Sequence, residues 1–88
     1  MANHKSAVKR AKQSEARRLR NRARKTRMKT AIRGLEEAIS GGSREAMEER
    51  LRQAISVIAK TASKGVIHRN TASRKISRLT RRVNAAVR

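Results

Sequence analysis

Residues 64–83 read Lys-Gly-Val-Ile-His-Arg-Asn-Thr-Ala-Ser-Arg-Lys-Ile-Ser-Arg-Leu-Thr-Arg-Arg-Val. On a helix, the apolar side chains of this stretch form one narrow stripe, which consists of Ala72, Ile76, Leu79 and Val83. The basic side chains gather on a second sector beside it, which holds Arg74, Lys75, Arg78, Arg81 and Arg82. The third sector carries uncharged polar side chains only. The pattern predicts a helix that packs one flank against protein and turns another flank toward a polyanion.

The composition of the whole chain limits both fold and function. The chain has 88 residues, which is one domain at most, and carries 25 Lys and Arg against 6 Asp and Glu, a net charge of +19. It has no aromatic residue, no cysteine and no proline. Apolar residues make up 36% of the chain and many of them are alanine, so the core must be small. Without cysteine there is neither a disulfide framework nor a thiolate metal site. No apolar run is long enough to span a membrane, and no apolar core of a secretory signal is present.

The charge is distributed in three blocks along the chain. Residues 1–33 carry 13 basic side chains and one acidic one, residues 34–59 carry 3 basic and 5 acidic ones, and residues 60–88 carry 9 basic ones and no acid. A neutral domain with a basic tail would not show two basic blocks around a mildly acidic middle. The distribution predicts two separate surfaces for a polyanion.

The first basic block belongs to one long predicted helix. Ser6 is a plausible N-cap, and Ala7 to Ser40 contains no proline and only Gly34 as an interruption. The second half has a clear apolar stripe, made of Met28, Ala31, Ile32, Leu35, Ala38 and Ile39, whereas the first half has little to pack with. We therefore expect residues 1–27 to form a basic extension of the helix and residues 28–88 to form a bundle.

The first basic block also repels itself. Like charges stand four residues apart in five pairs, namely Lys5/Lys9, Arg18/Arg22, Arg20/Arg24, Lys25/Lys29 and Lys29/Arg33. Each such pair costs roughly 0.2–0.5 kcal/mol on a helix surface. We expect this half of the helix to be largely disordered until a counter-charge binds it, and the bundle alone to be marginally stable.

Two further helices complete the predicted fold. Gly41-Gly42 ends the first helix, Ser43 caps the second, and Gly65 suits the left-handed position that closes the second near Ser63. Both loops are short, so successive helices should be antiparallel. The result is an all-α, three-helix, up-down-up bundle with a projecting N-terminal helix. Its expected core is Ile32, Leu35, Ile39, Leu51, Ile55, Ile58, Ile76, Leu79 and Val83.

Nucleic acid is the polyanion that the pattern favours. Readers of single strands stack bases on aromatic rings, which this chain lacks, so a folded or double-helical target held through phosphates and shape is expected. A membrane-surface helix needs a bulky apolar face, and residues 5–27 offer only Val8 and Leu19. The long first helix does not resemble a compact helix-turn-helix reader of DNA.

Nothing in the sequence predicts an enzyme, a cofactor or a small-molecule substrate. His4 and His68 have no cluster of metal ligands around them. Glu36 and Glu37 are adjacent on a helix and point about 100° apart, so they do not form a catalytic pair. No serine has a general base placed beside it, and no glycine pattern forms a phosphate loop.

Several segments resemble the bacterial small-subunit ribosomal protein S20 family. They are the opening MANHKSAVKR of residues 1–10, Gln13-Ser-Glu, Arg20-Asn-Arg, residues 25–30 and residues 64–79. The resemblance covers nearly the whole chain in order, while residues 36–56 are generic. It implies a three-helix bundle in the cytoplasm, on the ribosome, that binds 16S ribosomal RNA directly and early in assembly of the 30S subunit. Implied RNA partners are stems of the 5′ domain and the long stem near the 3′ end, with few or no protein contacts.

Carried over residue by residue, the resemblance implies RNA contact at Lys5, Lys9, Arg10, Gln13, Ser14, Arg17, Asn21, Arg24, Lys25, Lys29, His68, Asn70, Arg74 and Arg78. Neighbouring basic residues complete the expected RNA-binding set, namely Lys12, Arg18, Arg22, Lys64, Arg69, Lys75 and Arg82. The residue pattern indicates a polyanion clamp, and the resemblance identifies the polyanion as RNA.

Two other functions remain open on the residue pattern alone. A histone-like or nucleoid protein would compact DNA, although proline-lysine-alanine repeats and a dimer-forming aromatic core are missing. A membrane-active cationic helix would fold on anionic vesicles at least as readily as on RNA. Competition between folded ribosomal RNA and duplex DNA, and helix induction by vesicles, would discriminate among the three.

Overall fold

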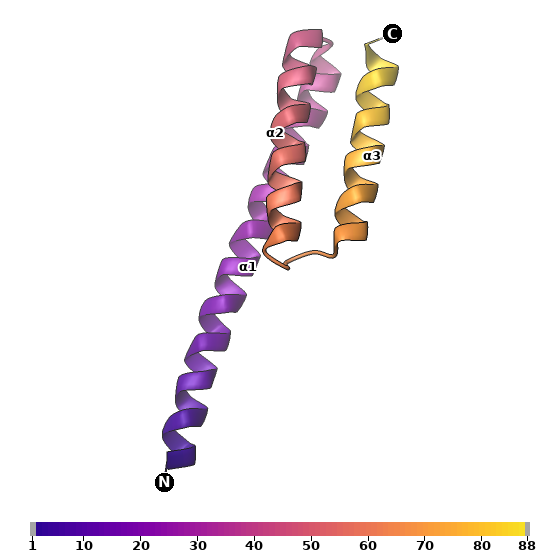
Figure 1. The fold of residues 1–88 in the computed structure, drawn as a ribbon. Helices are drawn as coiled ribbons and strands as arrows, with labels where there is room; N and C mark the ends of the chain where they lie inside the picture. The colour runs from indigo at the N-terminus through magenta and orange to yellow at the C-terminus, as the bar shows by residue number, and fades with distance from the viewer. Residues whose placement is uncertain (1, 88) are drawn as a thin grey trace.

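The computed structural model describes residues 2–87, with side chains from Lys5 onward, so the side chain of His4 lies outside the described part. Three α-helices and no strand make up this range: α1 Ala2–Gly41, α2 Arg44–Ser63 and α3 Arg69–Ala86 (Figure 1). The helices run up, down and up, as the short loops predict. The all-α fold with a long first helix is thereby confirmed.

The two predicted glycine stops are present, and each has a positive φ. Gly42 has φ +74°, and its N–H donates to the carbonyl oxygens of Ala38 at 3.2 Å and Ile39 at 3.3 Å. Gly65 has φ +76°, its N–H donates to Ala62 O at 2.9 Å, and the next N–H reaches Thr61 O at 3.2 Å. The second pattern is a Schellman motif, in which the left-handed residue turns the chain back onto the last carbonyls.

The two later helices have side-chain N-caps. The Ala46 N–H donates to Ser43 Oγ at 3.4 Å, which confirms the predicted cap of α2, and Glu45 lies in the first turn. At α3, the Asn70 N–H donates to His68 Nδ1 at 3.1 Å. Histidine thus takes the position that a shorter polar side chain usually occupies.

The predicted start of the first helix is wrong. Ser6 does not cap α1, because the helix already begins at Ala2 and Ser6 lies within it. No glycine or proline precedes Ser6, so the chain has no residue that would stop the helix from extending back to the N-terminus. A hydroxyl residue is tolerated inside a helix, and its presence alone does not mark an end.

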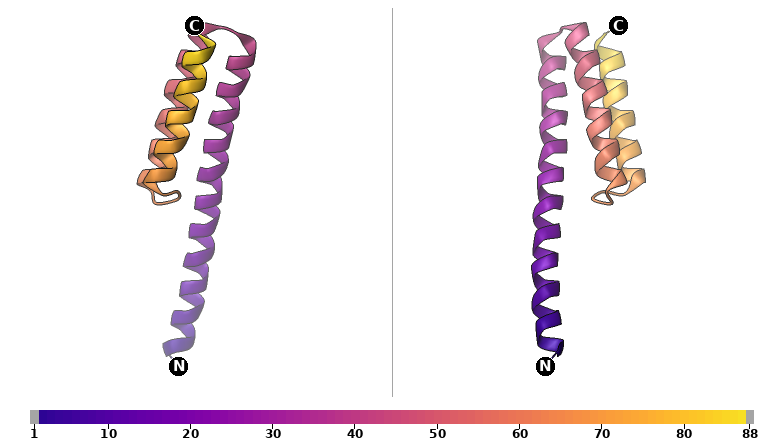
Figure 2. Two further views of the ribbon diagram at one scale, coloured as in Figure 1. Left: turned by 90° about the vertical axis from the view of Figure 1, so that its right-hand side faces the viewer. Right: turned by 60° about the vertical axis from the view of Figure 1, so that its left-hand side comes forward.

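The helix α2 lies at the centre of the bundle. It packs against both α1 and α3, which make much less contact with each other, and the two views of Figure 2 show α1 running beside the pair and continuing past it. An ion pair of 3.3 Å between Arg82 Nη1 of α3 and Glu36 Oε1 of α1 joins the outer helices. The molecule measures 67 × 22 × 13 Å, so it is far from spherical.

The core lies inside the bundle half and draws on all three helices. Leu35, Ala54 and Ile58 are completely buried. The remaining buried apolar residues are Met28, Met47, Ala72, Leu79 and Val83, and the partly buried residues packed against them include Ile32, Ile39, Leu51 and Ile76. Eight of the nine expected core residues therefore belong to the core or pack against it.

Ile55 is the exception among the expected core residues. It is half-buried and is not among the apolar residues that pack on the cluster. Ala54 and Ile58, four residues apart, face inward, and Ile55 is turned about 100° away from Ala54 on the same helix. Thr61 is buried instead, with its hydroxyl donating to Val57 O at 2.7 Å.

Candidate nucleic-acid interface

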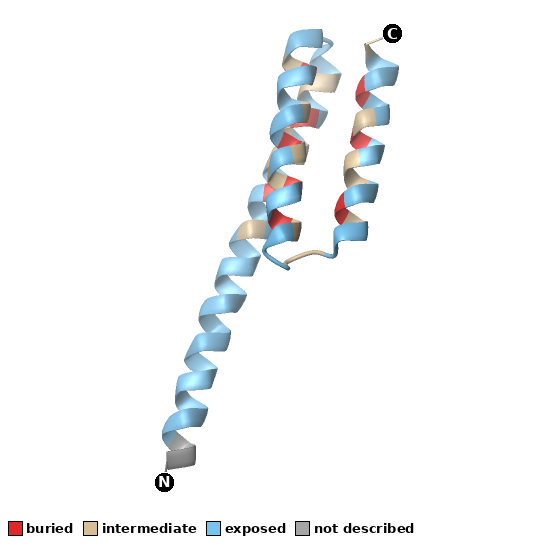
Figure 3. Ribbon diagram, in the orientation of Figure 1, coloured by how far each residue is buried: buried red, intermediate tan, exposed pale blue. Residues whose placement is uncertain are grey.

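Residues 5–23 of α1 make no tertiary packing contact that buries a side chain. Every residue from Lys5 to Ala23 is exposed, and the helix continues past the bundle as a single rod (Figure 3). Val8 and Leu19, its only large apolar side chains, are themselves exposed. The expected RNA-binding residues of this segment are thus accessible: Lys5, Lys9, Arg10, Lys12, Gln13, Ser14, Arg17, Arg18, Asn21, Arg22 and also Lys25.

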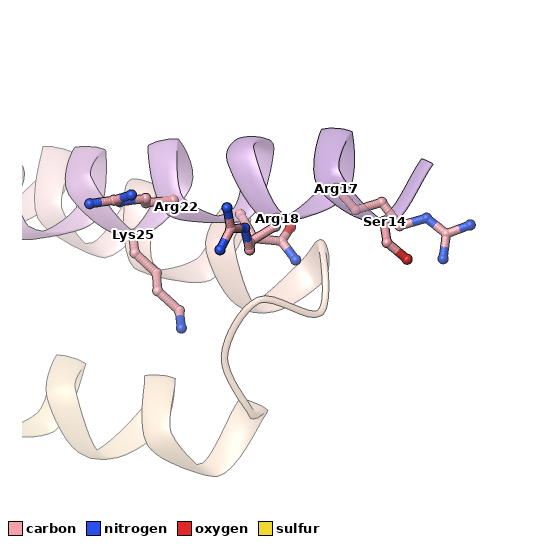
Figure 4. Close-up of a pocket in the computed structure, with 6 residues that line it drawn as sticks. Ser14, Arg17, Arg18, Arg22 and Lys25 are labelled. Atoms are coloured by element: carbon pink, nitrogen blue, oxygen red, sulfur yellow. The ribbon is translucent and has the colours of Figure 1, made fainter. Parts of the chain in front are cut away.

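Six of these side chains share one face of the helix. A shallow surface groove is lined by Ser14, Arg17, Arg18, Asn21, Arg22 and Lys25, and Figure 4 shows these side chains along the rod. Their spacings of three and four residues place them in successive turns on one side. Along this side, each of the uncharged residues Ser14 and Asn21 is followed by two cations, an arrangement that suits phosphate and sugar oxygens.

The local contacts of the groove are few and weak. Arg18 Nη2 lies 3.3 Å from Glu15 Oε1, and both side chains are largely exposed. Arg24 Nη1 donates to Asn21 Oδ1 at 3.5 Å. An exposed ion pair contributes about 0–1 kcal/mol, so a strong polyanion can replace such contacts at little cost.

The second basic surface lies on α3. Ala72, Leu79 and Val83 are buried against the bundle, which confirms the apolar stripe predicted for this helix. The expected RNA-binding residues on its other flanks are exposed, apart from the half-buried Lys75: Arg69, Asn70, Arg74, Arg78 and Arg82. This surface is distinct from residues 5–27 of α1, which we call the arm, because α3 packs in the bundle on α2 whereas the arm projects beyond the bundle (Figure 1).

Three expected residues have an additional structural role or position. His68 caps α3 through Nδ1, which leaves Nε2 as the other polar atom of the ring. Arg82 joins α3 to Glu36 of α1. Lys64 is the C-cap residue of α2 and lies across from α1 rather than on the α3 surface.

Two basic residues that the sequence reasoning did not select lie beside two that it did. Arg27 and Lys60 line a cleft between α1 and α2 together with Arg24 and Lys64. The three-residue spacing on α1 and the four-residue spacing on α2 indicate that each pair shares a helix face. Only the packing register of the two helices shows that the faces meet, and the sequence pattern does not fix that register.

The described residues offer no other chemical centre. Among the side chains of residues 5–87, no group of three or more His, Asp or Glu could hold a metal ion. In the same range, no helix is both long and apolar enough to cross a membrane. The two basic surfaces are therefore the candidate functional site of the described part of the chain.

Comparison with known proteins gives a consistent result along nearly the full chain. Residues 2–84 match the family model described as ribosomal protein S20. The small ribosomal subunit protein bS20 of Syntrophobacter fumaroxidans is 71% identical over 85 residues, which cover 97% of this chain and 99% of the relative. The protein of the same name from Desulfotalea psychrophila is 62% identical over 87 residues, covering 99% and 98% of the two chains. That from Desulforapulum autotrophicum is 59% identical over 81 residues, covering 92% and 96%.

Proposed function

The chain belongs to the ribosomal protein S20 family, and from this premise we propose that it binds 16S ribosomal RNA directly and helps to assemble and stabilise the 30S subunit. The family is one of structural ribosomal proteins and not of enzymes. The relatives are named as proteins of the small ribosomal subunit, which supports a place for this chain in the same particle.

The observation that carries the proposal is the exposed basic half of α1. Residues 5–27 hold 11 basic side chains and one acidic side chain, and residues 5–23 are exposed throughout. Such a segment has no tertiary packing to offset its self-repulsion, and its ion pair between Arg18 and Glu15 is exposed and therefore weak. Phosphates neutralise the repulsion, and the release of condensed counterions from the RNA drives binding.

The chemistry of the surface favours a folded RNA held by its backbone. The chain has no aromatic side chain on which an unpaired base could stack. Arginine forks and lysine ammonium groups bind phosphate oxygens, and side chains such as Ser14 and Asn21 can add hydrogen bonds to sugar hydroxyls. Recognition of this kind depends on shape, so it needs a target with a defined fold.

Two basic surfaces suit two RNA segments. The arm of α1 projects beyond the bundle, whereas the outer flank of α3 lies on the bundle itself, so the two surfaces can engage different RNA segments. We assign them to stems of the 5′ domain and to the long stem near the 3′ end of the RNA. Joining segments that are distant in the RNA sequence is how such a protein would stabilise a folded subunit.

Binding to purified 16S ribosomal RNA tests the proposal directly. We expect the RNA to outcompete duplex DNA of equal length at matched salt, and footprints to appear on both RNA segments. DNA that competes equally well would favour a nucleoid protein. Helix induction by anionic vesicles at least equal to that by RNA would favour a membrane-active helix.

A pair of matched double variants localises the binding. Replacing Arg17 and Arg22 with glutamine removes two cations from the α1 groove, whereas Arg33→Gln with Arg52→Gln removes two exposed cations from the bundle half. Both variants lose the same charge. We expect the groove variant to weaken RNA binding by about tenfold or more and the control to change it much less, because hydrogen bonds to charged groups contribute about 1.5–3 kcal/mol.

A further inference from the structure

The cleft between α1 and α2 lies where the arm leaves the bundle. It is lined by Arg24, Arg27, Val57, Lys60, Thr61 and Lys64 and has a volume of about 290 Å³. Met28, next to it on α1, is buried, whereas residues 5–23 are all exposed. The cleft therefore marks the boundary between the supported and the unsupported part of the long helix.

The cleft is strongly positive. Four of its six lining residues are cationic, and none is acidic. Among the described side chains, none of the four cations takes part in an ion pair. The C-terminal end of α2 contributes an opposing partial charge of only about −0.5 from its backbone dipoles. The four positive charges outweigh it, so the net field in the cleft favours an anion.

The uncharged residues that line the cleft, Val57 and Thr61, offer a ligand no free hydrogen-bond donor from their side chains. Val57 is half-buried and Thr61 is buried, and the Thr61 hydroxyl already donates to the Val57 carbonyl at 2.7 Å. Hydrogen bonds to a ligand must therefore come from the two guanidinium and two ammonium groups at the rim. The volume has room for a tetrahedral anion and several waters, since a water occupies about 30 Å³ in the liquid.

We infer that this cleft binds a backbone phosphate of the RNA and thereby ties the base of the arm to α2. The inference rests on the proposed function. Arginine presents paired donors to phosphate oxygens and lysine adds a point charge, and here each kind comes from a different helix. One phosphate held by both helices neutralises the repulsion between them and fixes the direction in which the arm leaves the bundle.

The test compares three full-length proteins on 16S ribosomal RNA: the wild type, the cleft variant Arg27→Gln with Lys60→Gln, and the control Arg33→Gln with Arg52→Gln. Each variant loses one exposed cation from α1 and one from α2, so the two variants have the same net charge and the same loss of charge on each helix. Circular dichroism confirms that both variants fold. Affinity is measured over a series of salt concentrations, because the slope reports the number of phosphates neutralised.

The cleft variant should bind about tenfold more weakly at the same salt, and its logarithmic salt slope should be shallower by about 1 than that of the wild type. The control should retain the wild-type slope. Equal behaviour of the two variants overturns the inference and leaves the proposed function in place. Failure of the wild type to bind the RNA overturns both.

Discussion

Adjacent glycines at the end of α1 have different conformational requirements. Gly42 has φ +74°, whereas Gly41 closes the helix without a positive φ, and an added Cβ would meet nothing within 4 Å at either position. Space is therefore not what distinguishes the two residues. The difference lies in the backbone, because a left-handed conformation costs an L-residue with a Cβ about 1–2 kcal/mol.

We predict that Gly42→Ala lowers the free energy of unfolding by about 1 kcal/mol, whereas Gly41→Ala leaves it unchanged or raises it slightly. Thermal unfolding followed by circular dichroism measures both. A shift of about 4–8 °C in the midpoint is expected for 1 kcal/mol in a domain of this size. Equal effects of the two substitutions on the free energy of unfolding would show that the left-handed conformation of Gly42 does not determine the difference.

The core provides a second matched pair on one helix. Ile58 is completely buried, whereas Ile55, three residues away on α2, is half-buried and outside the core cluster. We predict that Ile58→Ala costs about 2–5 kcal/mol and that Ile55→Ala costs clearly less. Urea unfolding of the bundle compares them. If Ile55→Ala were the more damaging change, the assignment of the inward face of α2 would be wrong.

The residue scale also shows what a periodic pattern can predict. The apolar stripe of α3 followed from spacing alone, and the left-handed Gly65 followed from its place after the second helix, because both depend on local geometry. The prediction that Ile55 belongs to the core was wrong, because α2 has more apolar residues than positions that face inward. Only the packing against α1 and α3 determines which of these residues face the core. Ser6 was placed wrongly because a good cap residue does not end a helix when the residues before it also favour one.

At the scale of elements, α1 is one continuous helix, but only its second half is stabilised by packing against the bundle. From Met28 onward it buries side chains against α2, whereas residues 5–23 bury none. In the exposed part, one ion pair between Arg18 and Glu15 opposes several like-charge pairs of similar individual magnitude. Most helical stability in proteins comes from tertiary packing of an apolar face, which residues 5–23 lack.

We therefore predict that, in the protein without RNA, amides from Ala11 to Arg24 exchange rapidly with solvent, whereas amides near Leu35 and Ile58 are protected. Hydrogen exchange read out by NMR measures this. Added 16S ribosomal RNA should protect the arm, since phosphates remove its repulsion. Strong protection of the arm in the absence of RNA would show that the helix is preformed.

The elements also explain why part of the candidate interface was not predictable. The exposed faces of α1 and α3 could be identified one helix at a time, from charge and period. The cleft of Arg24, Arg27, Lys60 and Lys64 depends on how far α2 is shifted along α1, which is set by side-chain packing between them. Arg27 and Lys60 gave no signal of their own that distinguished them from other surface cations.

At the scale of the whole molecule, charge and shape act together. The net charge of +19 is spread over a body 67 Å long, with the mildly acidic middle block concentrated around the turn between α1 and α2. A compact domain of this length would have a radius of gyration of about 12 Å, whereas the observed value is 17.8 Å. Most cations can therefore reach a polyanion without rearrangement of the bundle.

We predict a steep salt dependence of RNA binding. If the two basic surfaces neutralise about 6–10 phosphates, the slope of log affinity against log salt concentration is about −5 to −9. Filter binding or fluorescence titration over several salt concentrations measures it. A slope shallower than about −3 would show that few of these arginines and lysines touch phosphate.

The unpacked arm of α1 also bears on how long an unbound copy survives. Residues 5–27 present a lysine or arginine at 11 of 23 positions, and the part before Arg24 is exposed throughout. Such a segment is an accessible substrate for proteases that cleave after basic residues. RNA would cover the same positions, so surplus copies should be degraded while bound ones persist. Limited digestion with trypsin should cut the arm first in the isolated protein and spare it in the RNA complex. The abundance of the protein would then follow that of its RNA through turnover alone.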